Sequence, residues 1–209
     1  MSVILAFLTA VLLVLFGDRM LRRRATPEER VIVPRYVHPG HGWARRSSDG
    51  YVQVGIDEFG QGVIGSVDSI ELPRLLRRVR QGEVALRIRH GKRVVPVLSP
   101  VSGWVVEKNE MVQHDPTLVN TSPLGDGWLF KVRPVRFSSE VHNLMTGRAA
   151  SQWLELVRAR LAGLFAGTPA LLFQDGGFML ENLSDRCSDE EWDRVVSEIF
   201  HVEMTEAKQ

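Results

Sequence analysis

The chain has 209 residues, of which 44% are hydrophobic and 24% are charged, a composition that is ordinary for a globular protein. Its 26 lysines and arginines almost balance 25 aspartates and glutamates, so the net charge gives no case for a nucleic-acid-binding protein, which would need a basic excess. Cys187 is the only cysteine, which excludes an internal disulfide. Because no paired histidine motif surrounds it, we interpret this thiol as structural rather than nucleophilic.

The first segment is an unbroken apolar run, Val3–Phe16, which a basic cluster at residues 22–24 follows. The run is shorter than the roughly 20 residues that span a bilayer, but residues 1–21 reach that length if the charged side chains at their end extend toward the headgroups. The charge follows the run and no small-residue cleavage site is present, so the pattern favours an anchor over a signal peptide. We predict a transmembrane anchor at residues 1–24, a single-pass membrane protein and a cytoplasmic main domain. The alternative is a helix buried in a core.

Residues 25–37 contain two prolines and are interpreted as a linker. From residue 38 the chain consists of short apolar runs that glycine, proline, asparagine and aspartate interrupt. These runs predict strands at 51–56, 84–89, 93–98, 103–109 and 128–132. Strands at such short spacing, with turn signals between them, predict a small all-β barrel or sandwich. Residues 69–83 add a brief strand, a proline and a turn that ends at Gly82.

After Pro134 the apolar spacing becomes helical. Ser138 or Ser139 could cap a helix, and one face of that helix would carry Trp153, Val157, Leu161, Leu164 and Phe165. The glycines after Asp175 predict a hairpin. A capping box from Ser188 to Glu191 begins a second helix, whose apolar stripe is Trp192, Val195, Val196 and Ile199. The α-rich extension, residues 137–209, is too small to fold comfortably alone, so we expect it to pack on the β domain or on a partner.

Five motifs occur in a characteristic order over about residues 38 to 134. They are HGW (41–43), VQVGIDEFGQGVIGSVDSIELP (52–73), QGE (81–83), LSPVSGWVVEKNE (98–110) and LVNTSPLGDGW (118–128). Together they resemble the glycine cleavage system H protein family. The resemblance implies a barrel-sandwich hybrid for residues 38–136, in which two small antiparallel sheets carry a lipoyl hairpin at one end. The first 24 residues and the segment after residue 136 have no expected counterpart in the ordinary H protein.

The resemblance also implies a modification site. In the family the lipoylated lysine lies seven residues before the serine of the SPVSG turn, and that position is Lys92 here. We expect a hairpin with a tight turn at residues 90–91 and with Lys92 just past it. The family usually has glutamate three residues before the lysine, whereas this chain has Arg89, so the charge beside the site is reversed. The cations around the turn would then form a basic cluster that weakens recognition by a modifying enzyme. They are Arg87, Arg89, Lys92, Arg93 and His90.

A carrier, rather than an enzyme, is the function that the resemblance implies. Lys92 would bear lipoate, accept an aminomethyl group from a glycine cleavage decarboxylase, present it to an aminomethyltransferase and be reoxidised by a dihydrolipoyl dehydrogenase. The alternative is that the fold is retained without lipoate, so that Lys92 is a solvated turn residue. The protein would then be a membrane-tethered scaffold or interaction module.

Other candidate sites have weaker support in the sequence. His38, His41, His90 and His114 lack the spacing of a metal site. No pair of carboxylates is placed for acid–base chemistry, so neither metal ligands nor catalytic residues are predicted. Three tryptophans are expected to pack inside the domain rather than to form a stacking surface. They are Trp43, Trp104 and Trp128.

Overall fold

The structure is a computed structural model that describes residues 35–165, 173–174, 177–178 and 183–202. The predicted anchor at residues 1–24 therefore lies outside the described residues, as does most of the predicted linker at 25–37. Among the residues that are described, no helix combines the length and the apolar character that a membrane crossing requires.

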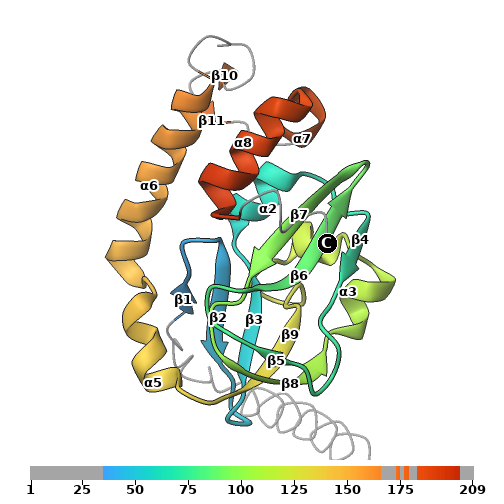
Figure 1. Cartoon of the computed structure of the whole chain (residues 1–209), viewed down its shortest axis with the longest axis vertical. Coiled ribbons are helices and arrows are strands. Elements are labelled where there is room, and N and C mark those ends of the chain that lie inside the picture. The colour runs from blue at the N-terminus through green and yellow to red at the C-terminus, as the bar shows by residue number, and fades with distance from the viewer. Residues whose placement is uncertain (1–34, 166–172, 175–176, 179–182, 203–209) are drawn as a thin grey trace, which may run out of the picture. The chain divides into compact units, whose positions relative to one another are not determined.

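Two antiparallel sheets form the β domain (Figure 1). The larger sheet has the order β1-β2-β3-β9-β8-β5 and the smaller one the order β4-β6-β7. The strands are β1 Arg35–Val37, β2 Gly42–Arg46, β3 Val52–Ile56, β4 Ser69–Glu71, β5 Arg78–Val79, β6 Val84–His90, β7 Arg93–Leu98, β8 Gly103–Lys108 and β9 Phe130–Pro134. This arrangement confirms the expected pair of antiparallel sheets. Residues 35–37 pair with β2, so the end of the predicted linker is a strand.

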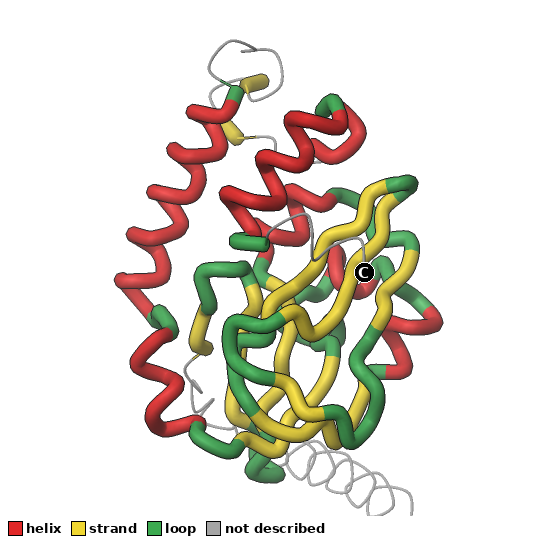
Figure 2. The backbone as a smooth tube through the Cα atoms, in the orientation of Figure 1, coloured by secondary structure: helices red, strands yellow, loops and turns green. Residues whose placement is uncertain are grey.

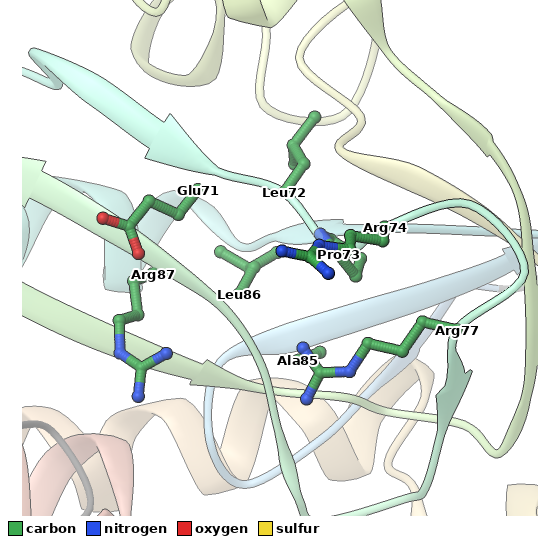
Figure 3. Close-up of a pocket in the computed structure, with 8 residues that line it drawn as sticks. All are labelled: Glu71, Leu72, Pro73, Arg74, Arg77, Ala85, Leu86 and Arg87. Carbon is green, nitrogen blue, oxygen red and sulfur yellow. The ribbon is translucent and has the colours of Figure 1, made fainter. Parts of the chain in front are cut away.

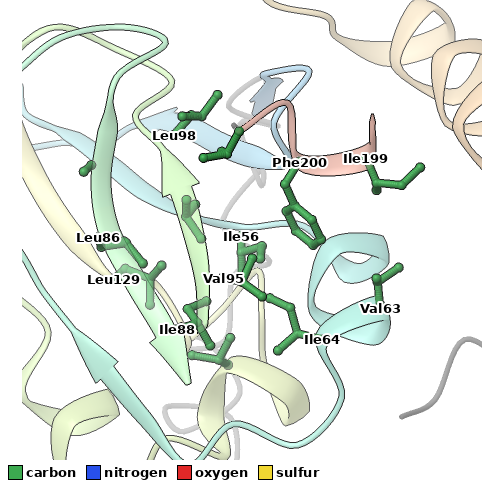
Figure 4. Packing of buried hydrophobic residues seen from close by; sticks show 14 of the residues in the cluster. Ile56, Val63, Ile64, Leu86, Ile88, Val95, Leu98, Leu129, Ile199 and Phe200 are labelled. Atoms are coloured by element: carbon green, nitrogen blue, oxygen red, sulfur yellow. The ribbon is translucent and has the colours of Figure 1, made fainter. Parts of the chain in front are cut away.

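The core lies between the two sheets because the strands alternate apolar and polar residues. On β6, Leu86 and Ile88 are buried, whereas Arg87 and Arg89 point away from the core. Figure 4 shows Leu86 and Ile88 among side chains from β3, β7, α2 and the segment before β9. The hairpin β6–β7 is thus held by its inner face, and on β6 the outer face carries arginines.

Three short helices interrupt the domain that the sequence predicted as all-β. They are α2 Glu58–Ile64, α3 Glu110–His114 and α4 Leu118–Thr121. Their lengths of four to seven residues are too short to produce a helical period in the sequence, and only their caps could have indicated them. The Asp57 side chain accepts the Gly60 amide at the start of α2, and Asn109 caps α3 in the same way.

The C-terminal segment is α-rich, as predicted. It contains α5 Phe137–Glu140, a 3₁₀ turn Val141–Asn143, α6 Gly147–Leu164, α7 Leu183–Arg186 and α8 Asp189–Phe200. The expected hairpin is the antiparallel pair β10 Phe173–Gln174 and β11 Gly177–Phe178. The capping box of α8 is present and its apolar stripe is buried. The predicted cap of the long helix is wrong, because Ser138 and Ser139 lie within α5 and α6 begins after Thr146.

The extension packs on the β domain. The Ser184 hydroxyl of α7 donates to the Ile64 carbonyl at the end of α2, over 2.6 Å. Phe200 of α8 is fully buried, and its ring lies 5.5 Å from that of His41. Figure 2 shows α7 and α8 beside α2 and next to one end of the β6–β7 hairpin, with α6 beside α8. The two alternatives for the extension are therefore resolved in favour of the β domain.

Candidate functional site

The predicted lipoyl hairpin is present, with its turn one residue further along than expected. His90 pairs with Arg93, so the two turn residues are Gly91 and Lys92 rather than residues 90 and 91. Gly91 has φ of +54°, as the first central residue of a type II′ turn requires. Glycine adopts this conformation without the steric cost that histidine would incur, which explains why the turn includes Gly91 and leaves His90 in the strand.

Lys92 therefore stands at the tip of the hairpin, and its side chain is 74% exposed. The expectation that one primary amine protrudes where β6 and β7 meet is confirmed. Attachment of lipoate to this amine stays a prediction.

A loop that follows α2 fixes the tip from the side of β4. The Asp68 carboxylate accepts the backbone N–H of Gly91, and the Asp68 amide donates to the Arg89 carbonyl over 2.9 Å. Ser66 Oγ lies 3.1 Å from His90 Nδ1. The turn is thus held by side chains from a neighbouring segment as well as by its own strand pairing, which gives Lys92 a defined position.

Carboxylates accompany the cations of the tip, contrary to the unpaired basic cluster expected from the sequence. Arg89 forms an ion pair with Glu71 on the adjacent strand β4. His90 Nε2 lies 2.7 Å from Asp185 Oδ1, and Arg93 lies 2.8 Å from Asp189 Oδ1. The expected cluster of uncompensated charge is therefore wrong, because no sequence pattern indicates which acids fold onto the tip.

The first turn of α8 lies directly against the tip. Arg93 donates to the Cys187 carbonyl over 2.7 Å, lies 5.6 Å from the centre of the Trp192 ring, and is only 11% exposed. Asp189 Oδ1 is also 3.0 Å from Lys92 Nζ. The hydrogen bond from Lys92, its charge and that of Arg93 lower the pKa of the Asp189 carboxyl. The acid that the family has on the hairpin itself is here supplied by the extension.

Asp185 and Asp189 are the residues that the sequence reasoning missed. The capping box predicts the start of α8 correctly, and Asp189 is the first residue of that helix. No periodicity or motif relates residue 189 to residue 92, so this contact could be found only from the fold.

The four histidines named in the sequence analysis do not come together at one site. His41 is fully buried, its Nδ1 lies 3.0 Å from Asp57 Oδ2, and its Nε2 has no hydrogen-bond partner among the described residues. Burial lowers the pKa of His38 to about 4, with smaller contributions from His201 and His41. His90 is at the hairpin tip and His114 ends α3. In the part of the chain that the structure describes, no three metal-ligating side chains come together.

Cys187 and two of the three tryptophans lie where the sequence placed them. Cys187 is buried, and burial raises the pKa of its thiol to about 11, which makes it unreactive at neutral pH. Trp43 is fully buried and Trp128 is half-buried. Trp104 is 46% exposed on β8 and is therefore not a core residue.

Comparison with known proteins matches residues 35–156 to the sequence model of the family described as glycine cleavage H-protein. The chain belongs to this family. Its members are non-catalytic carriers of the glycine cleavage system that typically bear lipoate, which confirms at family level the expectation of a carrier rather than an enzyme. The match continues into α6, so the expectation that nothing after residue 136 has a counterpart in the family is wrong for the first part of the extension.

Individual relatives give the same result. The chain is 36% identical to a probable glycine cleavage system H protein of Thermococcus gammatolerans over 120 residues, which cover 57% of this chain and 89% of the relative. It is 42% identical to the glycine cleavage system H protein of Alteromonas mediterranea over 93 residues, 44% of this chain and 72% of the relative. A crystal structure of a glycine cleavage system H protein from Mycobacterium marinum aligns with a TM-score of 0.49 and 28% identity, over 58% of this chain and 94% of the other.

Proposed function

We propose that this H-protein-family chain is a membrane-anchored lipoyl carrier and that Lys92 is its attachment site. The observation that carries the proposal is the exposed amine of Lys92 at a two-residue turn, in a chain whose family consists of lipoyl carriers. A modifying enzyme must reach one amine without opening the fold. A tight turn at the end of two paired strands presents such an amine.

Lys92 fits the cofactor better than the other two lysines that the structure describes. Lys131 is 15% exposed and contacts Asp49 and Glu107, and the hydrogen bond that its ammonium donates to Glu107 is the main cause of its raised pKa. Its amine is thus protonated and enclosed, which opposes acylation. Lys108 is half-buried within β8. Lys92 alone among the three combines exposure with a place outside a strand.

Lipoate bound to Lys92 would supply a long arm that carries an aminomethyl group between enzymes. The chain's own part would be to hold the attachment point. The loop at residues 66–68 fixes one side of the turn, and Asp189 lies on the other. By family membership, the proposed partners are the glycine cleavage decarboxylase, the aminomethyltransferase and dihydrolipoyl dehydrogenase.

The test is the intact mass of the full-length protein purified from its own host, supported by lipoyl-specific immunodetection. We expect a single lipoyl increment that disappears in Lys92→Ala and persists in the matched control Lys108→Ala. An unmodified mass, in cells whose other lipoyl proteins are loaded, would reject the carrier proposal.

The anchor at residues 1–24 is the second part of the proposal, and the apolar run with its following basic cluster supports it. Anchoring would be useful to a carrier whose partners are also membrane-bound, because it raises their effective concentration. We expect the full-length chain to resist alkaline extraction from membranes, and protease added to the outside of intact cells should leave residues 35–202 uncut. Release by alkali would contradict anchoring.

One observation favours the alternative, a membrane-tethered scaffold that has kept the fold without lipoate. Asp185 and Asp189 contact the tip through His90, Lys92 and Arg93, so part of the surface that a modifying enzyme would approach is covered by the extension. If the intact mass is unmodified, the same contacts identify the tip as an internal docking point for α7 and α8.

A further inference from the structure

A second surface of the β domain combines exposed apolar side chains with arginines. It includes the loop between β4 and β5 and the adjacent part of β8. Leu75 is 54% exposed and Leu76 is 75% exposed, and Trp104 is 46% exposed opposite Arg78 in the pairing of β5 with β8. We call this surface the arginine–leucine face. It comprises Arg74, Leu75, Leu76, Arg77, Arg78 and Trp104.

The outward position of Leu76 is built into the backbone. Leu76 has φ of +62°, a conformation that bulky residues rarely adopt. Two hydrogen bonds to β8 hold it there, because the Leu76 amide donates to the Val105 carbonyl over 2.8 Å and the Val105 amide donates to the Arg77 carbonyl over 3.0 Å. An apolar side chain kept in solvent by a strained but firmly bonded loop suggests a contact that the isolated chain does not make.

The charge around these leucines has one sign. Arg74, Arg77 and Arg78 are exposed and have no ion-pair partner among the described residues. The nearby acids, Glu71 and Glu83, already form ion pairs with other arginines. The face therefore presents positive charge without local compensation, in a protein whose overall charge is almost balanced.

A cavity of about 420 Å³ adjoins the loop. Figure 3 shows Arg74 and Arg77 reaching toward β6 near Leu86 and Ala85. Arg87 and the carboxylate of Glu71 also line the cavity. Guanidinium groups beside a surface hollow suit a phosphate, because they pair with its oxygens in a fixed geometry.

We propose that the arginine–leucine face docks on an anionic lipid surface, with Leu75 and Leu76 entering the headgroup region and the three arginines binding lipid phosphates. Positive charge together with aliphatic side chains that protrude into solvent is the combination that binds an anionic lipid surface, and it favours lipid over an acidic protein. The apolar run Val3–Phe16, which lies outside the described residues, independently predicts that the chain resides at a membrane. The proposal does not depend on lipoylation.

The test compares two leucines of similar exposure on different elements. Leu76→Cys on the face and Leu156→Cys on α6, which is 71% exposed in the wild type, are each labelled with an environment-sensitive maleimide in the full-length chain. The buried Cys187 should not compete, because its thiol pKa is raised to about 11. Labelled protein is mixed with vesicles of phosphatidylcholine alone or with added phosphatidylserine.

We expect a blue shift and quenching by a lipid-borne nitroxide at position 76 only, and only with phosphatidylserine. The label at position 156 is the control, because a response there would come from membrane contact that does not involve the arginine–leucine face. Each single change of Arg74, Arg77 or Arg78 to glutamine should weaken the response about fivefold, the equivalent of about 1 kcal/mol for one juxtamembrane cation. The triple change to glutamate should abolish it while circular dichroism shows the fold intact.

Two outcomes would overturn the proposal. Equal responses at positions 76 and 156 would show that the chain approaches the bilayer without using this face. No response at position 76 with either lipid would exclude lipid and leave an acidic protein as the occupant.

Discussion

Replacing Arg93 by alanine should destabilise the protein far more than replacing its neighbour Lys92. The two side chains are adjacent cations at one turn and both contact Asp189, but Arg93 is 11% exposed and Lys92 is 74% exposed. Only Arg93 donates to a backbone carbonyl of the extension and lies over Trp192. The structure therefore assigns the attachment of α8 to Arg93 and leaves Lys92 free of a structural role.

The magnitude follows from those two contacts. A hydrogen bond from a charged donor is worth about 1.5–3 kcal/mol, and a partly desolvated cation over an aromatic ring adds about 1 kcal/mol. We expect Arg93→Ala to cost about 3 kcal/mol, which for a domain of this size lowers the melting temperature by about 10 °C. An exposed ion pair contributes little, so Lys92→Ala should leave the midpoint unchanged within error.

The assay is thermal unfolding of the full-length chain in mild detergent, followed by circular dichroism, together with amide hydrogen exchange of α8. In Arg93→Ala the amides of α8 should exchange faster, while those of β3 and β9 should change less. An Arg93→Ala midpoint equal to that of the wild type would refute the docking geometry. Equal loss in both would refute the use of Lys92→Ala as a clean control for lipoylation.

Three further predictions concern stability and titration. Burial lowers the pKa of His38 from 6.5 to about 4. Between these pH values the unfolded chain therefore binds a proton at His38 that the native protein does not bind. His38 should lower the stability by at most about 3 kcal/mol as the pH drops from about 6.5 to 4, and chemical denaturation should show a weaker pH dependence in His38→Asn. Burial also lowers the pKa of His201, so part of the dependence should persist in this variant. Neutralising Lys92, by Lys92→Gln or by acylation, should raise the pKa of the Asp189 carboxyl in an NMR titration, because Lys92 is the main cause of its depression; an unchanged value would contradict the contact. Gly55→Ala should cost more than about 2 kcal/mol in denaturant titration because its methyl group would meet a buried indole, whereas Gly163→Ala, with open space around it, should be neutral or stabilising.

The strands were predictable because their apolar residues alternate against a core. Leu86 and Ile88 point inward and the arginines between and after them point outward, which is the pattern that the sequence itself displays. The buried stripe and capping box of α8 were predictable for the same local reason. The short helix α2 was missed because seven residues do not establish a helical period, and its cap at Asp57 is also common in turns.

The position of Lys92 was predictable to within one residue, and its surroundings were not. Both possible turns contain Gly91, and only strand pairing decides whether His90 or Lys92 shares the turn with it. The partners of the tip come from residues 185 to 189, almost a hundred positions later. The charges of the hairpin residues alone indicated mutual repulsion among the cations of the tip. A sequence shows which charges are present but not which of them meet in the fold.

The cations of the tip are compensated from two sides. Arg89, at the position of reversed charge, pairs with Glu71 on β4, whereas His90, Lys92 and Arg93 face Asp185 and Asp189 of the extension. The extension thus places a carboxylate within 3.0 Å of the Lys92 amine, where the hairpin strand has arginine. An enzyme that recognises a lysine with an acid beside it could therefore still find both groups at this tip, although the acid now belongs to a different element. Asp189→Asn removes the carboxylate beside Lys92 together with the ion pair of Arg93, but it keeps the hydrogen bond of Arg93 to the Cys187 carbonyl and its contact with Trp192, so we expect α8 to stay attached.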